Sequence, residues 1–195
     1  MKLEAQLDQL AELGLVLNPE VTIDDLLYSS ERAEFEKDPF NCLLFLFGAE
    51  VEREPYGRRI CNQVWNFDLE CIDGTGDYVN IVQNLCFLAG KSNYLTDLVD
   101  YINLDYTNMA ASECWLEYTI DDRRQHWPIE ANGDWADMMT ITYVMEDLQQ
   151  EGKQFYSKDN GQSMILFYLD RVTAEKLGDL CDEDLEPVIP SESSY

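Results

Sequence analysis

The sequence predicts an α+β fold, with a mainly antiparallel sheet, packed helices and a helical N-terminal segment. Three observations favour this class. Apolar residues recur at helical spacing near the N-terminus, two alternating segments flank a turn in the second half, and 46% of the 195 residues are hydrophobic, which is enough for a substantial core. A chain of this length fits one large domain or two small ones.

The first 48 residues are expected to contain several helices separated by turns. Leu3, Leu7, Leu10 and Leu13 fall on one helical stripe, and Gly14 ends that helix. The last part of this region is almost wholly apolar, and periodicity does not distinguish a buried helix from a strand there; we favour a helix. Together with two short helices over residues 24–27 and 30–37, this gives a third further helix over 40–48.

The middle of the chain mixes strands and a helix. Residues 60–72 are rich in β-branched and aromatic side chains and predict a strand, although three of them are Asn or Asp. A turn over 73–77 then leads into a helix over 78–89, whose apolar residues share one face. Residues 95–104 alternate in part and predict another strand.

Residues 113–120 and 123–130 predict a β-hairpin around the turn Asp121-Asp122. In the first strand, alternation places Trp115 with Glu117 on one face and the neighbouring apolar residues on the other. Proline in the second strand indicates a sheet edge or an early end. Asp134 is then expected to cap a helix that runs through residue 148, and later elements are a strand over 163–169 and a helix over 173–181.

One continuous α+β domain is predicted over residues 1–182. A weak boundary could fall at 106–112, where the residues are small and bland. Residues 183–195 contain two prolines and several acidic and serine residues, so we expect a mobile acidic tail.

The charge is the most informative property of the chain. It has 39 Asp and Glu against 13 Lys and Arg, a net charge of −26. A folded protein with this balance repels nucleic acid and anionic membranes and attracts basic surfaces. The six cysteines form no Cys-x-x-Cys pair, the N-terminus has no signal-type apolar segment, and the longest apolar run, 42–47, is too short to span a bilayer. We therefore expect a cytoplasmic protein with buried free thiols.

Few residues suggest catalysis. His126 is the single histidine, which excludes sites that need two. Gly74-Thr75-Gly76 lacks the rest of a dinucleotide or phosphate-binding motif and is flanked by aspartates, so a turn and helix cap is the favoured interpretation. The densest acidic cluster, over 179–186, lacks the spacing of a calcium-binding loop. We predict no enzyme activity and assign no catalytic, cofactor-binding or metal-binding residue.

Aromatic and acidic side chains on the predicted hairpin favour protein binding. Tryptophan beside a carboxylate suits a basic partner that contains arginine, through stacking and ion pairing. Core packing beneath solvated acids is the alternative interpretation of the same residues. The residues we select as candidate contacts are Trp115, Glu117, Asp121, Asp122, Asp134 and Trp135.

A longer pattern surrounds these residues. It consists of the hairpin strand with Tyr118, the turn, the returning strand and the predicted helix, followed by Phe155-Tyr156, Asn160-Gly161-Gln162 and an apolar strand that ends at Leu169. In this order of elements, residues 115–169 resemble small α+β immunity proteins that bacteria use against polymorphic toxins. The resemblance implies an inhibitor that binds one toxin domain and performs no chemistry.

The leading hypothesis is therefore a non-catalytic acidic protein, an immunity-type inhibitor of a basic partner. Three alternatives stay open. The first is a DNA mimic with carboxylates at phosphate-like spacing, the second is a carboxylate-based enzyme or divalent-metal-binding domain, and the third is a housekeeping domain whose acidity serves solubility. The sequence predicts no oligomeric state.

Overall fold

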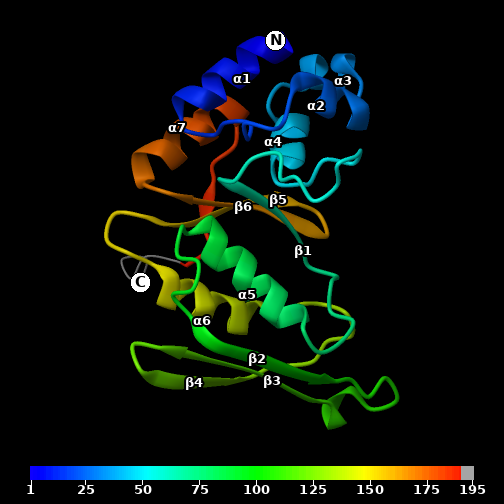
Figure 1. The fold of residues 1–195 in the computed structure, drawn as a ribbon, viewed down its shortest axis with the longest axis vertical. Coiled ribbons are helices and arrows are strands. Elements are labelled where there is room, and N and C mark those ends of the chain that lie inside the picture. Colours follow the sequence, from blue (N-terminus) through cyan, green and yellow to red (C-terminus); the bar gives the residue numbers. More distant parts are fainter. Residues whose placement is uncertain (190–195) are drawn as a thin grey trace. The chain divides into compact units, whose positions relative to one another are not determined.

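The structure is a computed structural model that describes residues 1–189. This part of the chain forms two sheets with packed helices (Figure 1). The pairings between the consecutive strands of each hairpin are antiparallel. The predicted α+β class is confirmed. The chain forms two compact units, the first from residues 1–67 and from residue 151 onward, and the second from residues 68–150.

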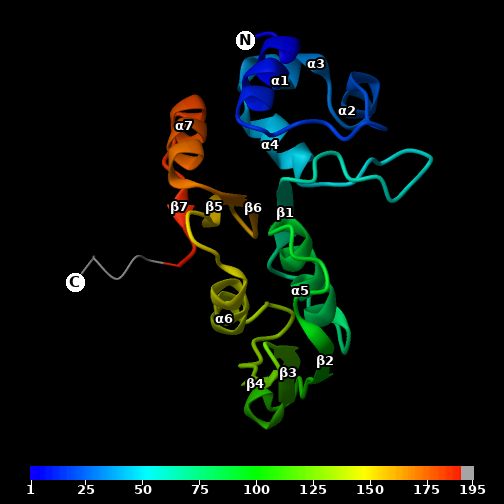
Figure 2. The same cartoon turned by 60° about the vertical axis from the view of Figure 1, so that its left-hand side comes forward.

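The first unit contains five helices and a four-stranded sheet with the order β1-β6-β5-β7 among its described residues (Figure 2). Its elements are α1 (Leu3–Glu12), α2 (Ile23–Ser29), α3 (Arg32–Lys37), α4 (Asn41–Phe47), β1 (Val64–Asp68), β5 (Gln154–Asn160), β6 (Ser163–Leu169), α7 (Arg171–Cys181) and β7 (Glu186–Pro187). The helical N-terminal segment is confirmed, including the apolar stretch at α4.

The core of the first unit brings the N-terminal helices together with β6 and α7. A buried amide fixes the packing of α1, because the Gln6 side chain donates to the Phe35 carbonyl (2.8 Å) and accepts from the Phe40 amide (2.9 Å). These bonds satisfy backbone groups at the ends of α3 and α4 that burial would otherwise leave unpaired.

The second unit is a three-stranded antiparallel sheet with α5 and α6 on one face (Figure 1). Its elements are α5 (Asp77–Leu88), β2 (Thr96–Asn103), the short 3₁₀ helix η1 (Met109–Ala111), β3 (Glu113–Ile120), β4 (Arg123–Pro128) and α6 (Met138–Leu148). The sheet order is β2-β3-β4, so the strand that contains Pro128 is an edge strand, as predicted.

The turn before α5 uses carboxylates where an anion-binding loop would hold phosphate. Buried Asp100 on β2 accepts hydrogen bonds from the Gly76 amide (2.6 Å) and the Val79 amide (3.2 Å). Asp77 accepts from the Gly74 amide (2.8 Å). Protein carboxylates therefore satisfy these donors, which confirms the interpretation as a turn and helix cap.

Two predicted elements differ from the structure, and one strand of the structure was not predicted. The strand expected over 60–72 is confined to 64–68. The helix expected to begin at Asp134 begins at Met138 and is capped by Asp137, whose carboxylate accepts from the Met139 amide (3.0 Å). Strand β5 was not predicted, although its partner β6 was.

The segment around Asp134 cannot be helical because its backbone pairs elsewhere. The Asp134 carbonyl accepts from the Ile72 amide (2.9 Å), and the Ala136 amide donates to the Leu69 carbonyl (2.8 Å). These bonds join the segment to residues 69–72, which explains both why the helix starts late and why the earlier strand is short.

The suggested boundary and residues 183–189 of the predicted tail both belong to the folded units. Residues 106–112, the suggested weak boundary, lie inside the second unit. Of the tail predicted to be mobile, residues 183–189 contain buried Leu185 and strand β7, and the Val188 amide donates to the Phe155 carbonyl (3.0 Å). Gly178 permits this approach, since a Cβ there would lie 2.9 Å from the Glu183 carbonyl oxygen. The rest of the predicted tail lies outside the described residues.

Within residues 1–189, no helix has the length and apolar character needed to cross a membrane. All six cysteines are free, as predicted, and four of them are buried. Burial raises the pKa of Cys61, Cys86 and Cys181 to about 11, so these thiols are protonated at neutral pH.

Candidate binding surface

The face of the second sheet opposite α5 and α6 displays an aromatic row. Strand register places Trp115 of β3 between Tyr101 of β2 and Pro128 of β4. The rings of Tyr101 and Trp115 stack with their centroids 5.9 Å apart, and Trp115 lies 5.8 Å from the His126 ring. Tyr101 and neighbouring Val99 are each 39% exposed. We call Val99, Tyr101, Trp115, Glu117 and His126 the open sheet face.

Glu117 is the central charge of the open sheet face. Arg124 Nε donates to Glu117 Oε2 (3.1 Å), and His126 Nδ1 lies 2.9 Å from Oε1. These two partners, Arg124 first, hold the pKa of Glu117 below its ordinary value. Arg124 also donates to the Asp97 carbonyl (2.8 Å), so one cation joins β4, β3 and β2 across the surface.

The opposite face of β3 is tied to α6 by hydrogen bonds and ring stacking. Tyr118 is buried, and its hydroxyl donates to Asp147 on α6 (2.7 Å) while it accepts from the Trp127 indole (2.9 Å). The Trp127 ring stacks on Tyr143 of α6 at 4.4 Å. Burial raises the pKa of Tyr118, so the phenol stays a donor. The central strand of the open sheet face is therefore held by α6 on its buried side.

Asp121 and Asp122 form the tip of the hairpin. Both have positive φ, 49° and 60°, which aspartate tolerates in a two-residue turn. Both are exposed, and Asp121 lies 3.9 Å from Arg123. The structure thus brings four of the six predicted contact residues onto one hairpin.

The other two predicted residues lie on a different segment. Asp134 and Trp135 pair through the backbone with residues 69–72, and Trp135 is 37% exposed. Sequence reasoning also missed Tyr101, Val99 and the role of His126 as a partner of Glu117. The alternation of β2, with Asp100 and Ile102 buried and Val99 and Tyr101 exposed, is the signal that could have identified the first two.

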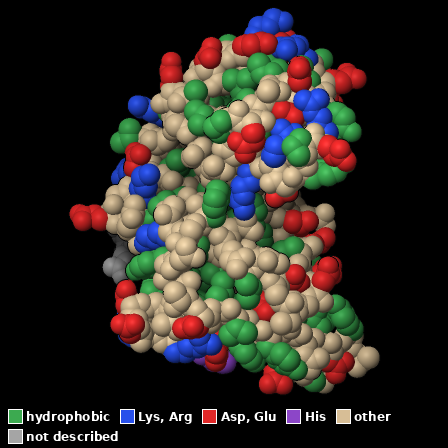
Figure 3. Space-filling view, viewed as in Figure 1, with side chains coloured by type: hydrophobic (Ala, Val, Ile, Leu, Met, Phe, Trp, Pro, Cys, Tyr) green, Lys and Arg blue, Asp and Glu red, His purple; other side chains and the backbone are tan. Residues whose placement is uncertain are grey.

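The second unit is as acidic as the chain as a whole. Residues 68–150 contain 16 Asp and Glu against three Lys and Arg, a net charge of −13. Two of these three cations, Arg123 and Arg124, lie on the hairpin. Figure 3 shows Asp and Glu side chains spread over the visible surface and not gathered in one patch.

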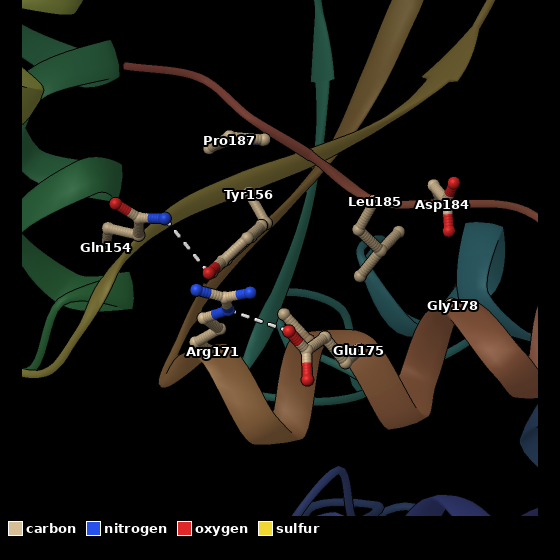
Figure 4. A pocket seen from close by; sticks show the side chains of 9 residues that line it. Gln154, Tyr156, Arg171, Glu175, Gly178, Asp184, Leu185 and Pro187 are labelled. Atoms are coloured by element: carbon tan, nitrogen blue, oxygen red, sulfur yellow. Dashed lines mark hydrogen bonds and ion pairs between the residues drawn. The ribbon is translucent and has the colours of Figure 1, made fainter. Parts of the chain in front are cut away.

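A pocket of about 440 Å³ lies in the first unit (Figure 4). It is lined by residues of α7, of β5, and of β7 with the two residues before it. Its polar side chains are largely paired with one another. Arg171 donates to Glu175 (2.7 Å), and the Gln154 amide donates to the Tyr156 hydroxyl (2.9 Å). Asp184 adds a second carboxylate to the lining. The pocket therefore presents mixed charges that indicate no single ligand chemistry.

Among residues 1–189, no three His, Cys, Asp or Glu side chains converge in a way that could hold a metal ion. Comparisons of the chain with protein families, with curated proteins and with solved structures found no significant match. The similarity of residues 115–169 to immunity proteins therefore stays a prediction.

Proposed function

We propose that this protein is a non-catalytic binding protein that engages a basic partner protein through the open sheet face. The observation behind the proposal is the stacked, partly exposed pair Tyr101 and Trp115 next to Glu117. Aromatic side chains are enriched among residues that dominate binding energy, and Arg124 and His126 hold the Glu117 carboxylate in place beside them.

The charge supports a basic partner. A net charge of −26 accelerates association with a cationic surface and disfavours nucleic acid and anionic lipid. Within this proposal, the finer function is that of a bacterial immunity-type inhibitor, which would block a cationic toxin domain by covering its surface. The resemblance of residues 115–169 is the reason for this finer proposal.

The test is a pull-down from the lysate of the source organism with the tagged chain, washed at low and then moderate salt. We expect one basic protein in stoichiometric amount to remain at moderate salt. Trp115→Ala and Glu117→Gln should each reduce the retention of this protein, because each removes a central contact. For Trp115→Ala, the Kd of the complex should rise at least about tenfold.

Met139→Ala is the matched control, since Met139 is 61% exposed in the same unit but lies on α6, which packs on the other face of the sheet. It should leave retention unchanged. Loss of many basic proteins together as salt rises would overturn the proposal, because it would mean that the charge binds without specificity.

A further inference from the structure

A loop in the first unit is held in place although its side chains contribute nothing to the core. Residues 52–57 lie within the connection between α4 and β1 and extend away from the rest of their unit (Figure 2). Their side chains are exposed except that of Arg53, which is half-buried. In this loop, which we call the Tyr56 loop, the Tyr56 side chain is 70% exposed.

The base of the Tyr56 loop is closed by backbone pairing. Glu50 and Arg59 form an antiparallel bridge, and the Val51 amide donates to the Arg58 carbonyl (2.8 Å). Val51 and Ile60, on the two sides of the base, are buried in the core of the unit. The two ends of the loop are therefore fixed relative to each other.

Arg58 holds the inside of the loop. Its guanidinium donates to the Pro55 carbonyl (2.8 Å) within the loop and to the Glu20 carbonyl (2.8 Å) outside it. A longer bond reaches the Arg53 carbonyl (3.5 Å). The Arg58 side chain is only 15% exposed, so it acts as an internal brace.

A buried carboxylate anchors this brace. Asp25 on α2 is 3% exposed and accepts from Arg58 Nη2 (3.2 Å) and Arg53 Nε (2.8 Å). Arg53 in turn lies over the ring of exposed Tyr28, 5.9 Å from its centroid. Two of the 13 cationic residues of the chain and one buried acid thus fix a segment that buries none of its own apolar groups.

We propose that the Tyr56 loop is a preformed binding element that inserts the Tyr56 ring into a concave cationic site of a partner protein, with exposed Glu52 and Glu54 of the same loop facing its positive charge. A loop fixed before binding avoids the ordering cost that a free loop would incur. The exposed Tyr56 ring supplies contact area, and the exposed carboxylates of Glu52 and Glu54 match a cationic recess. This inference rests on the proposed function for the basic character of the partner, but it uses a different unit of the chain.

The test uses the full chain and the protein retained at moderate salt in the pull-down, once that protein is purified. Kd is measured for the wild type, for Tyr56→Ala and for Tyr106→Ala. Tyr106 is the matched control, because it is also 70% exposed but lies in the second unit. We expect Tyr56→Ala to raise Kd at least about tenfold and Tyr106→Ala to change it less than about twofold.

A second pair of measurements tests insertion and bracing. Oxidative footprinting should show Tyr56, but not Tyr106, protected in the complex. Arg58→Lys keeps Tyr56 but removes the fork that reaches two loop carbonyls. We expect faster amide exchange in residues 52–57 and a several-fold weaker complex.

The outcomes separate the two proposals. If Tyr56→Ala and Tyr106→Ala have the same effect on Kd, or if Tyr56 stays accessible in the complex, the Tyr56 loop is not the binding element. If only Trp115→Ala weakens the complex, the open sheet face stands and the loop inference falls. If the wild-type chain retains no specific protein, both fall.

Discussion

Asp25 is a buried carboxylate in a chain with three times as many acidic as cationic residues. Its hydrogen bond from the Thr22 amide lowers its pKa most, and Arg53 and Arg58 lower the pKa further against the opposing effect of burial. Charged and hydrogen-bonded, it caps α2 and anchors the Tyr56 loop. Arg53 and Arg58 therefore pair with an acid of the chain itself, as Arg124 also does with Glu117 on the open sheet face.

Asp25→Asn should lower the free energy of unfolding at pH 7 by about 2 kcal/mol, because two guanidinium groups lose a charged acceptor. Urea denaturation measures this change. Asp24→Asn is the control, since Asp24 lies in the same helix turn but is exposed. Equal effects of the two substitutions would contradict the anchoring role of Asp25.

The pH dependence of the same difference follows from the lowered pKa of Asp25. A carboxylate with a lowered pKa in the folded state stabilises the fold fully above its unfolded pKa, about 3.9, and loses this contribution as the pH falls further. The stability gap between wild type and Asp25→Asn should thus be constant from about pH 7 to 5 and shrink below about pH 4. If the stability gap already shrinks near pH 6, the pH dependence belongs to another titrating group and not to Asp25.

At the scale of elements, local patterns predicted the hairpin of β3 and β4 because alternation and turn residues lie within sixteen consecutive positions. Local patterns failed where contacts between segments distant in the sequence determine the structure. Asp134 looks like a helix cap, but its backbone pairs with residues 69–72. Strand β5 contains Lys158, which is buried only because Glu183, 25 residues further on, pairs with it.

The candidate surface shows the same division. The shared face of Trp115 and Glu117 follows from the two-residue period of a strand and was predicted. The placement of Tyr101 beside Trp115 depends on the register between β2 and β3, which no local pattern encodes. The conformation of the Tyr56 loop depends on contacts between residues 20, 25 and 58, which no local pattern encodes.

The contact between α4 and β1 gives a prediction at this scale. A Cβ on Gly48 would lie 2.2 Å from the Asn66 amide nitrogen, whose hydrogen bond to the Gly48 carbonyl (2.9 Å) joins the two elements. Gly48→Ala should therefore displace β1 and lower the free energy of unfolding by about 2–3 kcal/mol, measured by urea denaturation. Gly74→Ala, where a Cβ meets no atom within 4 Å, should cost less than about 0.5 kcal/mol.

At the scale of the whole molecule, both units share the excess of acid. Residues 68–150 have a net charge of −13, half of the total of −26. Acidity is therefore not the property of one tail or one patch. Under the proposed function, long-range attraction would bring a basic partner near, and the aromatic residues of the open sheet face and the Tyr56 loop would supply the selectivity.

The same charge should make stability depend on salt. Repulsion among carboxylates destabilises the folded chain, and salt screens it over a Debye length of about 10 Å at 0.1 M. The free energy of unfolding from urea titrations should rise as NaCl increases from low to moderate concentration. CaCl2 at matched ionic strength separates screening from ion binding. Equal stabilisation by the two salts supports screening. A much larger effect of calcium would favour the alternative of a divalent-metal-binding domain. The reason is that a ligand that binds only the folded state stabilises it by mass action.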